Sequence, residues 1–351
     1  MRRKLLFSAR RLLLPLVPLY RLALAIRELR LLAAPARRLR YPVVSIGNLS
    51  TGGSGKTPLT IALARALLQR GIRVDVLSRG YGRQSQWIDR VDEHGVAEDF
   101  GDEPLLIARV TGVPVYVSTQ RYDAGLLAEE DAQPISEQNH QSIVHLLDDG
   151  FQHRQLYRDV DILLLNHEDL TDCLLPAGNL REPLRAFQRA TVLAVPADEP
   201  EVEQYLREII PIDRNSETSR WIGPIWRLRR TMEIPAVNGP VGAFCGIARP
   251  EQFFAGLEAA GLNLAVRAAF PDHHRYTPRD LERLIAFASV AGATALLTTE
   301  KDLVRLGKLA SAFPASMPIA AARLHIEIED QTAAIDWLVK RLTPSPSHPP
   351  L

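Results

Sequence analysis

Residues 48–58 combine residue types that could hold the phosphates of a nucleotide. They read NLSTGGSGKTP and end like the G-x-x-x-x-G-K-[ST] phosphate-binding loop (P-loop), although Ser50 stands where that pattern begins with glycine. In such a loop glycines let backbone N–H groups approach the phosphates, the lysine meets the β- and γ-phosphates, and the next hydroxyl binds Mg²⁺. The pattern predicts a nucleotide site formed by Thr51, Gly52, Gly53, Ser54, Gly55, Lys56, Thr57 and Pro58, with Thr57 as a metal ligand.

Two adjacent acids, Asp148 and Asp149, follow the apolar run IVHLL at 143–147. An apolar strand that ends in an acid is the usual partner of a P-loop, because its carboxylate helps to hold the magnesium ion. Two acids after a strand are also common in ordinary loops and helix caps. With a P-loop upstream, we favour a metal role for this pair, and the sequence does not choose between its two members.

Short β-branched runs alternate with helical patterns around these residues. The run 42–48 is expected to be a buried strand that leads into the P-loop, and residues 57–70 follow a helical period that ends at Gly71. Further strands are expected at 72–78, 113–118, 142–149, 160–166 and 191–197. Nearly continuous apolar strands separated by helices indicate a parallel sheet covered on both faces. We therefore predict an α/β fold of the P-loop NTPase type, with a doubly wound, mostly parallel sheet.

A second, smaller α/β unit is expected after a break in this alternation. Strand candidates at 241–248, 264–270 and 294–300 are separated by helical patterns at 250–260 and 278–291. We predict a P-loop core domain at 41–220, a linker at 221–240, a smaller domain at 241–342 and a disordered, proline-rich tail at 343–351. Two α/β domains joined by a linker favour a cleft between them.

The N-terminal segment 1–40 has an unusual charge. It contains eleven Lys or Arg residues and the single acid Glu28, whereas the whole chain has a formal net charge of +1. A basic arm on a mildly acidic body is typical of proteins with an anionic partner, either a membrane surface or nucleic acid. The apolar run 12–20 is too short to cross a bilayer, which needs about 20 residues.

Basic and leucine side chains at the start of this arm separate onto two sides of a helix, and Pro15 and Pro18 interrupt a single long helix. We predict a helical hairpin or broken helix that lies in the membrane interface. The leucines, and the lack of interleaved aromatic residues, favour lipid over nucleic acid.

The arm is also open to two different interpretations. A cleaved signal peptide is conceivable, but Arg21 lies inside the region where cleavage would occur. A basic helix that packs on the protein's own acidic body is the second alternative. Cys173 and Cys245 are isolated from each other in sequence, which argues against a disulfide framework or a zinc site and suits a reducing compartment.

Seven motifs, taken in order, resemble those of the tetraacyldisaccharide 4′-kinases, the lipid A 4′-kinases of Gram-negative bacteria. They are SIGNLSTGGSGKTP (45–58), SRGYGR (78–83), GDEP (101–104), DDGFQH (148–153), LLPAGNLREP (174–183), FPDHHRYT (270–277) and TTEKD (298–302). They span about 260 residues of the printed sequence. In this family the first P-loop position is typically not glycine, so Ser50 departs only from the generic motif.

The resemblance implies a phosphotransferase with an alcohol acceptor. The γ-phosphate of ATP would pass to the 4′-hydroxyl of a lipid A disaccharide 1-phosphate precursor, at the cytoplasmic face of the inner membrane. The basic arm would bind the anionic surface of that membrane, and no nucleic acid would be bound.

Residue roles follow from the same resemblance. Asp102 paired with His273 would be the base for the acceptor hydroxyl, with the two residues contributed by different domains, so that domain closure would assemble the site. Glu103, Thr57 and either Asp148 or Asp149 would surround Mg²⁺. Arg181 would neutralise phosphate charge, with Glu182 its neighbour in the motif.

Several assignments stay open at this point. His274 could replace His273, and His153 could be structural. Arg79 and Tyr81 could bind ligand or only shape a turn, and the TEKD motif could be an exposed capping loop. The alternative function is a P-loop switch protein that acts at the membrane or in metal delivery, but Thr51 stands where the signature lysine of that group would be. A guanine-reading N-K-x-D motif is also not found in the sequence.

Overall fold

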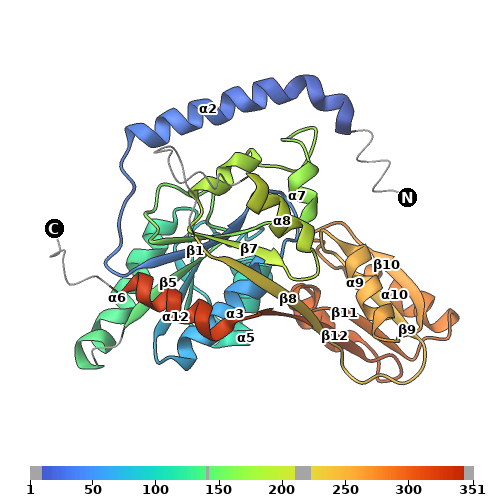
Figure 1. Cartoon of the computed structure of the whole chain (residues 1–351). Helices are drawn as coiled ribbons and strands as arrows, with labels where there is room; N and C mark the ends of the chain where they lie inside the picture. The colour runs from blue at the N-terminus through green and yellow to red at the C-terminus, as the bar shows by residue number, and fades with distance from the viewer. Residues whose placement is uncertain (1–9, 140–141, 210–222, 344–351) are drawn as a thin grey trace. The chain divides into compact units, whose positions relative to one another are not determined.

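The computed structural model describes residues 10–139, 142–209 and 223–343 (Figure 1). The chain divides into two compact units. Unit 1 consists of Met1–Arg79, Gln120–Arg229 and Ile326–Leu351, and unit 2 of Gly80–Thr119 and Arg230–His325. This division differs from the predicted domains 41–220 and 241–342, because each unit takes a segment that the sequence pattern places in the other. Parts of the predicted arm, core domain, linker and tail (1–9, 140–141, 210–222 and 344–351) lie outside the described residues.

Six parallel strands form the centre of unit 1. Their order is β8-β7-β6-β1-β5-β2, and each neighbouring pair is parallel. The strands are β1 (Val43–Asn48), β2 (Arg73–Ser78), β5 (Ile143–Asp148), β6 (Val160–Leu164), β7 (Val192–Pro196) and β8 (Ile225–Glu233), the last of which continues into unit 2. The predicted parallel sheet is confirmed, and β1 leads directly into the P-loop as expected.

Helices cover the strands of unit 1 on either side (Figure 1). Leu163 of β6 and Val195 of β7 pack in one core cluster with Leu206 of α8 (Pro200–Ile209). Helix α3 (Lys56–Gln69) contacts β1, β2 and β5. Burial on both faces explains why these strands are almost continuously apolar in sequence.

The remaining helices of unit 1 connect or flank these strands. They are α6 (Arg121–Asn139), α7 (His167–Thr171), the 3₁₀ helix η2 (Leu184–Arg189) and α12 (Gln331–Leu342). Trp337 of α12 meets Trp226 of β8 edge-on, with ring centroids 6.3 Å apart. This contact fixes the C-terminal helix on unit 1.

Unit 2 contains four parallel strands, ordered β10-β9-β11-β12. Successive residues of β9 (Val241–Cys245) face opposite layers: Ala243 and Cys245 pack with α9 (Pro250–Ala259), and Phe244 packs with α10 (Pro278–Val290). This alternation follows from the two-residue period of a strand. It also gives Cys245 a structural role as a core residue.

The other elements of unit 2 are short. The other parallel strands are β10 (Leu264–Ala269), β11 (Ala295–Thr299) and β12 (Ile319–Ile328), whose last residues belong to unit 1. The segment Gly80–Thr119, which we call the inserted segment, belongs to unit 2 although unit 1 precedes and follows it in the chain. It contains the antiparallel strands β3 (Asp89–Arg90) and β4 (Val115–Val117) and the helices α4 (Ala97–Phe100) and α5 (Asp102–Thr111). The helix α11 (Glu300–Leu306) precedes the 3₁₀ helix η3 (Gly307–Ala312).

The N-terminal arm forms the 3₁₀ helix η1 (Arg11–Leu16) and one helix, α2 (Val17–Ala33). The described part of the arm forms no hairpin; a 3₁₀ stretch leads into a single α-helix, which partly agrees with the expected interruption. Pro15 lies in the 3₁₀ helix, and Pro18 lies in the first turn of α2, where a missing N–H costs no helical hydrogen bond.

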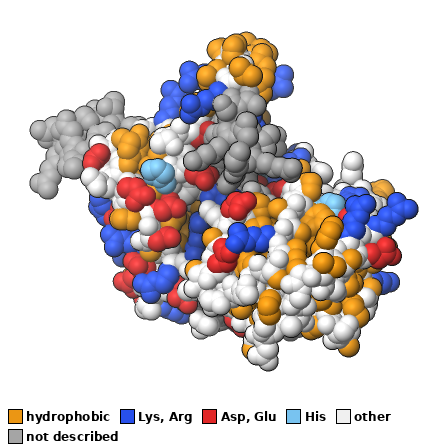
Figure 2. Space-filling model, turned by 90° about the vertical axis from the view of Figure 1, so that its right-hand side faces the viewer, with side chains coloured by type: hydrophobic (Ala, Val, Ile, Leu, Met, Phe, Trp, Pro, Cys, Tyr) orange, Lys and Arg blue, Asp and Glu red, His pale blue; other side chains and the backbone are white. Residues whose placement is uncertain are grey.

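One side of α2 packs on unit 1 and the other side is exposed. Tyr20 and Leu24 rest against the core cluster of α8, whereas Leu19, Leu29 and Leu32 are 65%, 67% and 71% exposed. Figure 2 shows hydrophobic and basic side chains together on this projecting helix. Among the described residues, no helix combines the length and apolar character that a membrane span requires.

Candidate active site

The P-loop connects β1 to α3 in the predicted strand–loop–helix arrangement. Gly55 is the residue before α3 and has φ = 92°, and Gly52 has φ = 107°. These left-handed conformations favour glycine, whereas Gly53 has no positive φ. The first backbone N–H groups of a helix have no intrahelical acceptor, so the N-terminus of α3 at the end of this loop is the arrangement that binds phosphate.

Lys56 takes part in a network of charged and polar groups at this loop. Its Nζ donates to Oδ1 of the buried Asn48 at 3.1 Å and lies 3.6 Å from Oδ1 of Asp149. Arg181 donates to the same Asn48 oxygen at 2.5 Å and forms two hydrogen bonds with Asp149. Asn48 therefore holds both cations at the start of the loop, a role that its place in the P-loop motif did not reveal.

The motif at 174–183 lines the P-loop. Thr51 donates its backbone N–H to the carbonyl of Asn179, and Arg181 Nε donates to the carbonyl of Ser50 at 3.1 Å. An isolated antiparallel bridge also joins Ser50 to Leu180. Ser50 therefore lies where the P-loop pairs with the motif at 174–183. This pairing holds Arg181 beside the predicted phosphate site.

The two acids after β5 have different surroundings. Asp148 is buried and accepts a hydrogen bond of 2.9 Å from Thr60 of α3. Asp149 has φ = 49°, which is unusual for a non-glycine residue, and its carboxylate faces Lys56 and Arg181. Burial alone would raise the pKa of Asp149, but Lys56, Arg181 and Arg121 hold it well below its ordinary range.

The predicted metal ligands are divided between the units. Thr57, Asp148 and Asp149 belong to unit 1 and Glu103 to unit 2. The described residues contain no group of three or more His, Cys, Asp or Glu side chains that could hold a metal ion by themselves. Mg²⁺ usually takes only one or two carboxylates from a protein and completes its shell with water and substrate phosphates. A hydroxyl and a carboxylate beside the P-loop fit that pattern.

Arg121 and His153 add a second electrostatic feature that the sequence did not reveal. Arg121 is 7% exposed; burial and the nearby Arg79 lower its pKa to about 10. Burial and Arg121 lower the pKa of His153 to about 4, so this imidazole is neutral near pH 7. Arg121 follows β4 outside all seven motifs, and so no local pattern marked it.

Asp102 and His273 form the predicted pair, and both lie in unit 2. Oδ2 of Asp102 is 3.1 Å from Nδ1 of His273, and Asp102 is buried at the first turn of α5. The expectation that two domains supply these residues differs from the structure, because the segment Gly80–Thr119 packs with the C-terminal strands. Burial alone would raise the pKa of Asp102, but His273, Arg305 and Lys301 keep it well below its ordinary range.

His274 has a different partner from His273. Its Nε2 lies 3.2 Å from Oδ2 of Asp280, which forms the capping box of α10 with Thr277. His273 has φ = 57°, and its ring lies 4.9 Å from that of Tyr81. The geometry thus directs His273 to Asp102 and His274 to a helix cap.

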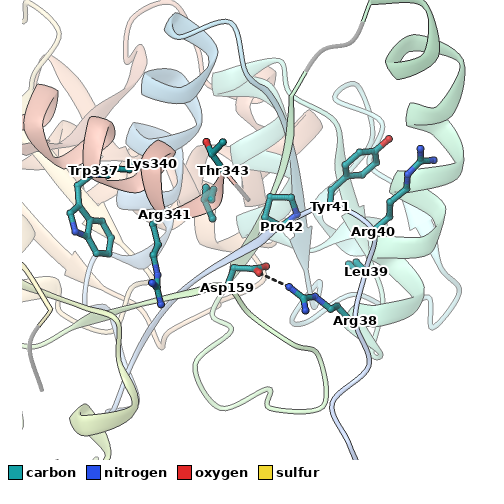
Figure 3. A pocket seen from close by; sticks show the side chains of 11 residues that line it. Arg38, Leu39, Arg40, Tyr41, Pro42, Asp159, Trp337, Lys340, Arg341 and Thr343 are labelled. Carbon is teal, nitrogen blue, oxygen red and sulfur yellow. Dashed lines mark hydrogen bonds and ion pairs between the residues drawn. The ribbon is translucent and has the colours of Figure 1, made fainter. Parts of the chain in front are cut away.

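A small hollow of about 70 Å³ lies over the pair. Tyr81, Asp102, His273 and Arg305 are among the residues that line it. A larger hollow of about 580 Å³ in unit 1 is lined by residues such as Arg38, Tyr41, Trp337 and Arg341 (Figure 3). It contains none of the predicted site residues.

The arm contacts the motif that lines the P-loop. Tyr20 donates its hydroxyl to the carbonyl of Arg181 at 2.9 Å, and Arg27 lies 3.6 Å from Glu182. Glu182 also pairs with Arg189, so it holds the helix and the motif together. The alternative of a basic helix packed on its own body therefore describes one side of α2.

The family model of LpxK, tetraacyldisaccharide-1-P 4′-kinase, matches residues 9–343. The chain belongs to this family. A tetraacyldisaccharide 4′-kinase of Koribacter versatilis (strain Ellin345) is 42% identical over 314 residues, which cover 87% of this chain and 90% of that protein. The tetraacyldisaccharide 4′-kinase of Dechloromonas aromatica (strain RCB) is 39% identical over 340 residues, which cover 94% and 92%.

A solved structure of an LpxK is also similar. The crystal structure of "apo" form LpxK from Aquifex aeolicus in complex with ATP aligns with a TM-score of 0.69 and 32% identity, and covers 95% of this chain and all of that chain. Membership of the tetraacyldisaccharide-1-P 4′-kinase family confirms the resemblance seen in the motifs, the kinase class and the α/β fold. The roles of individual residues stay predictions.

Proposed function

We propose that this member of the family transfers the γ-phosphate of ATP to the 4′-hydroxyl of a tetraacyldisaccharide 1-phosphate, a precursor of lipid A. The observation that carries the proposal is the network of Lys56, Asn48, Asp149 and Arg181 at a glycine loop that opens a helix. Relatives named for this activity, and a related structure in complex with ATP, support it.

In this proposal unit 1 holds the nucleotide. Backbone N–H groups of residues 51–57 would cradle its phosphates, and Lys56 would meet the γ-phosphate. Because Lys56 is already held by Asn48 and Asp149, its ammonium group needs little reorganisation on binding. Arg181 would neutralise charge on the transferred group, and Ser54 and Pro58 would shape the ends of the loop.

Thr57 and one or both of Asp148 and Asp149, all residues of unit 1, would hold Mg²⁺. The ion bound with ATP supplies charge neutralisation on the phosphates. Asp149 stays ionised because of Lys56 and Arg181, so it is ready to act as an oxygen ligand. Asp148 is fixed by Thr60, which suits a ligand or a group that orients one.

Asp102 and His273 would receive the proton of the acceptor hydroxyl. Both oxygens of Asp102 already accept hydrogen bonds: Oδ1 from the backbone of Glu103, and Oδ2 at His273 and Arg305. The side chain of His273 is 32% exposed, against 5% for that of Asp102, so the imidazole is the accessible end of the pair. An imidazole held by a carboxylate is a common general base.

The exposed leucines of α2 and the basic residues beside them would bind the anionic surface of the inner membrane at its cytoplasmic face. A helix with an apolar face and Arg residues on its polar side is suited to that interface. The lipid acceptor resides in such a membrane, and α2 contacts the motif that holds Arg181.

Transfer is tested with purified protein, Mg-ATP and tetraacyldisaccharide 1-phosphate in detergent micelles. The expected product carries a new phosphate at the 4′ position, and an acceptor already phosphorylated there should give none. Absence of product together with rapid ATP hydrolysis without acceptor would instead support the switch-protein alternative.

A further inference from the structure

Asp102 and Glu103 of the inserted segment each contact a basic side chain from one short stretch, Thr299–Arg305, which we call the clamp segment. It begins at the N-cap of α11 and includes the TEKD motif. The motif is not the exposed capping loop considered from sequence, because Asp302 is fully buried and Arg305 is 6% exposed in its side chain.

Arg305 contacts Asp102 directly. Its Nε donates to Oδ2 of Asp102 at 2.6 Å, its Nη2 donates to the same oxygen, and its Nη1 donates to Oδ1 of Asp302 at 2.8 Å. Oδ2 of Asp102 is also the atom that faces Nδ1 of His273. Arg305 and His273 therefore contact the same carboxylate oxygen. By holding that oxygen in place, Arg305 sets the position at which His273 meets Asp102.

Asp302 fixes Arg305 in turn. Its carboxylate accepts hydrogen bonds from the backbone N–H of Gly246, the hydroxyl of Tyr276 and the hydroxyl of Thr299. The carbonyl of Gly246 accepts one from Arg305, and also one from the backbone N–H of His273. The clamp segment thus holds both members of the Asp102–His273 pair, one through a guanidinium and the other through the turn at Gly246.

Lys301 makes the matching contact with the second acid. Its ammonium group donates to Oε1 of Glu103, which follows Asp102 in the first turn of α5. Each of the two adjacent acids thus has a cation of α11 beside it. The two cations lie one helical turn apart on α11, four residues being the spacing that places side chains on one face.

We propose that the clamp segment is the positioning element of the acid–histidine pair, with Arg305 orienting Asp102 toward His273 and Lys301 holding Glu103. This inference rests on the proposed function for its effect on transfer. Arg305 is a positioning residue, since it acts on the acceptor hydroxyl only through Asp102 and His273.

The test uses the full chain with Arg305→Ala and Arg305→Lys. Loss of the guanidinium should lower kcat for 4′-phosphate transfer by about 10- to 100-fold, the range expected when a reacting group is misplaced by about an ångström. KM for ATP should stay within about twofold, since Arg305 belongs to unit 2 and the nucleotide groups to unit 1. Added guanidinium chloride at non-denaturing concentration should restore part of kcat in Arg305→Ala, and Arg305→Lys should retain more activity than Arg305→Ala.

The matched control is Arg283→Ala, an exposed arginine of α10, which should change neither kcat nor its response to guanidinium. In an Asp102→Ala background, Arg305→Ala should cause little further loss, because its partner is already gone. An unchanged kcat in Arg305→Ala, or a fall in kcat that only tracks a loss of folded protein and that guanidinium does not relieve, would overturn the proposal.

Stability measurements separate this inference from the proposed function. A double-mutant cycle of Arg305→Gln and Asp102→Asn, followed by thermal unfolding, should show coupling between the two residues whatever the reaction is. If wild-type protein transfers no phosphate although the coupling is present, the proposed function fails. If wild-type protein transfers phosphate and Arg305→Gln does so equally well, the positioning role fails. If Arg305→Ala does not fold, the transfer rates of Lys301→Met and Lys301→Arg are compared instead. Lys301→Met removes the cation beside Glu103, and Lys301→Arg keeps it.

Discussion

The guanidinium of Arg181 meets the carboxylate of Asp149 through two hydrogen bonds, of 3.1 and 3.2 Å. Such a two-point contact fixes the plane of both groups and favours the ionised carboxylate. Arg181 also reaches Asn48 and the carbonyl of Ser50, so one side chain joins β1, the P-loop and the end of β5. Removal of either partner should therefore affect phosphate handling more than folding.

Lys56 should be needed for phosphate transfer. Lys56→Ala should lower phosphate transfer by at least about 100-fold, because a fixed cation beside the transferring phosphoryl group is lost. Lys340→Ala, which removes an exposed lysine of α12, should leave transfer unchanged. Initial rates at saturating ATP decide the matter, and a Lys56→Ala enzyme with more than a tenth of wild-type activity would contradict the assignment.

The two acids after β5 should respond differently to neutralisation. Asp149→Asn should reduce kcat strongly and change Tm little, since this carboxylate faces Lys56 and Arg181 at the loop. Asp148→Asn should reduce both, because Asp148 is buried and accepts the hydroxyl of Thr60. The two variants are compared by transfer rate and thermal unfolding. Equal losses of Tm would argue against the distinction.

Substitutions of the adjacent histidines His273 and His274 should have different effects, one on catalysis and the other on stability. His273→Gln should lower kcat by about 100-fold or more, the usual contribution of a general base, and add little to the effect of Asp102→Ala. His274→Gln should mainly cost stability, on the order of 1 kcal/mol, because His274 supports the capping box of α10. A His274→Gln enzyme that folds normally but transfers no phosphate would reverse the assignment.

His153 should make the protein sensitive to acid. Burial and Arg121 lower its pKa to about 4, so between pH 6.5 and 4 the unfolded chain binds a proton at this residue that the folded chain does not. Stability from this group is therefore fully present above pH 6.5 and is lost as the pH falls toward 4. Wild-type Tm should drop more steeply over this range than that of His153→Gln. His94→Gln, at an exposed histidine, should follow the wild type.

The exposed side of α2 should govern binding to lipid vesicles. Leu19→Gln, Leu29→Gln and Leu32→Gln combined should reduce co-sedimentation with anionic vesicles more than tenfold, since each buried leucine is worth about 1.5–3 kcal/mol. Val290→Gln removes a 90% exposed apolar residue of unit 2 and should have no effect. These substitutions are cleaner than deletion of the arm, which would uncover the core cluster under Tyr20 and Leu24. Unchanged sedimentation of the triple variant would refute membrane binding through α2.

Strands were predictable where the chain is almost continuously apolar. β1, β5, β6 and β9 lie where expected, because strands covered on both faces need apolar side chains at every position. The strands β8 and β12 were not predicted. Their sequences, IWRLRRTME and IAAARLHIEI, mix charged with apolar residues, and several of their side chains are exposed. The predicted linker and domain boundaries differ from the two units partly for this reason.

The sequence by itself determined the P-loop, the acids after β5 and the family, because these depend on residue types at fixed local spacing within each motif. The pairing of Asp102 with His273 came only from the family resemblance, which left His274 open. Only the tertiary structure decided that Asp102 and His273 share unit 2, that His273 and not His274 faces Asp102, and that Arg121, Arg305 and Lys301 stand beside the acids. Arg305 is 203 residues from Asp102 in the chain. A contact at that separation depends on how strands and helices pack, and no local pattern in the chain records it.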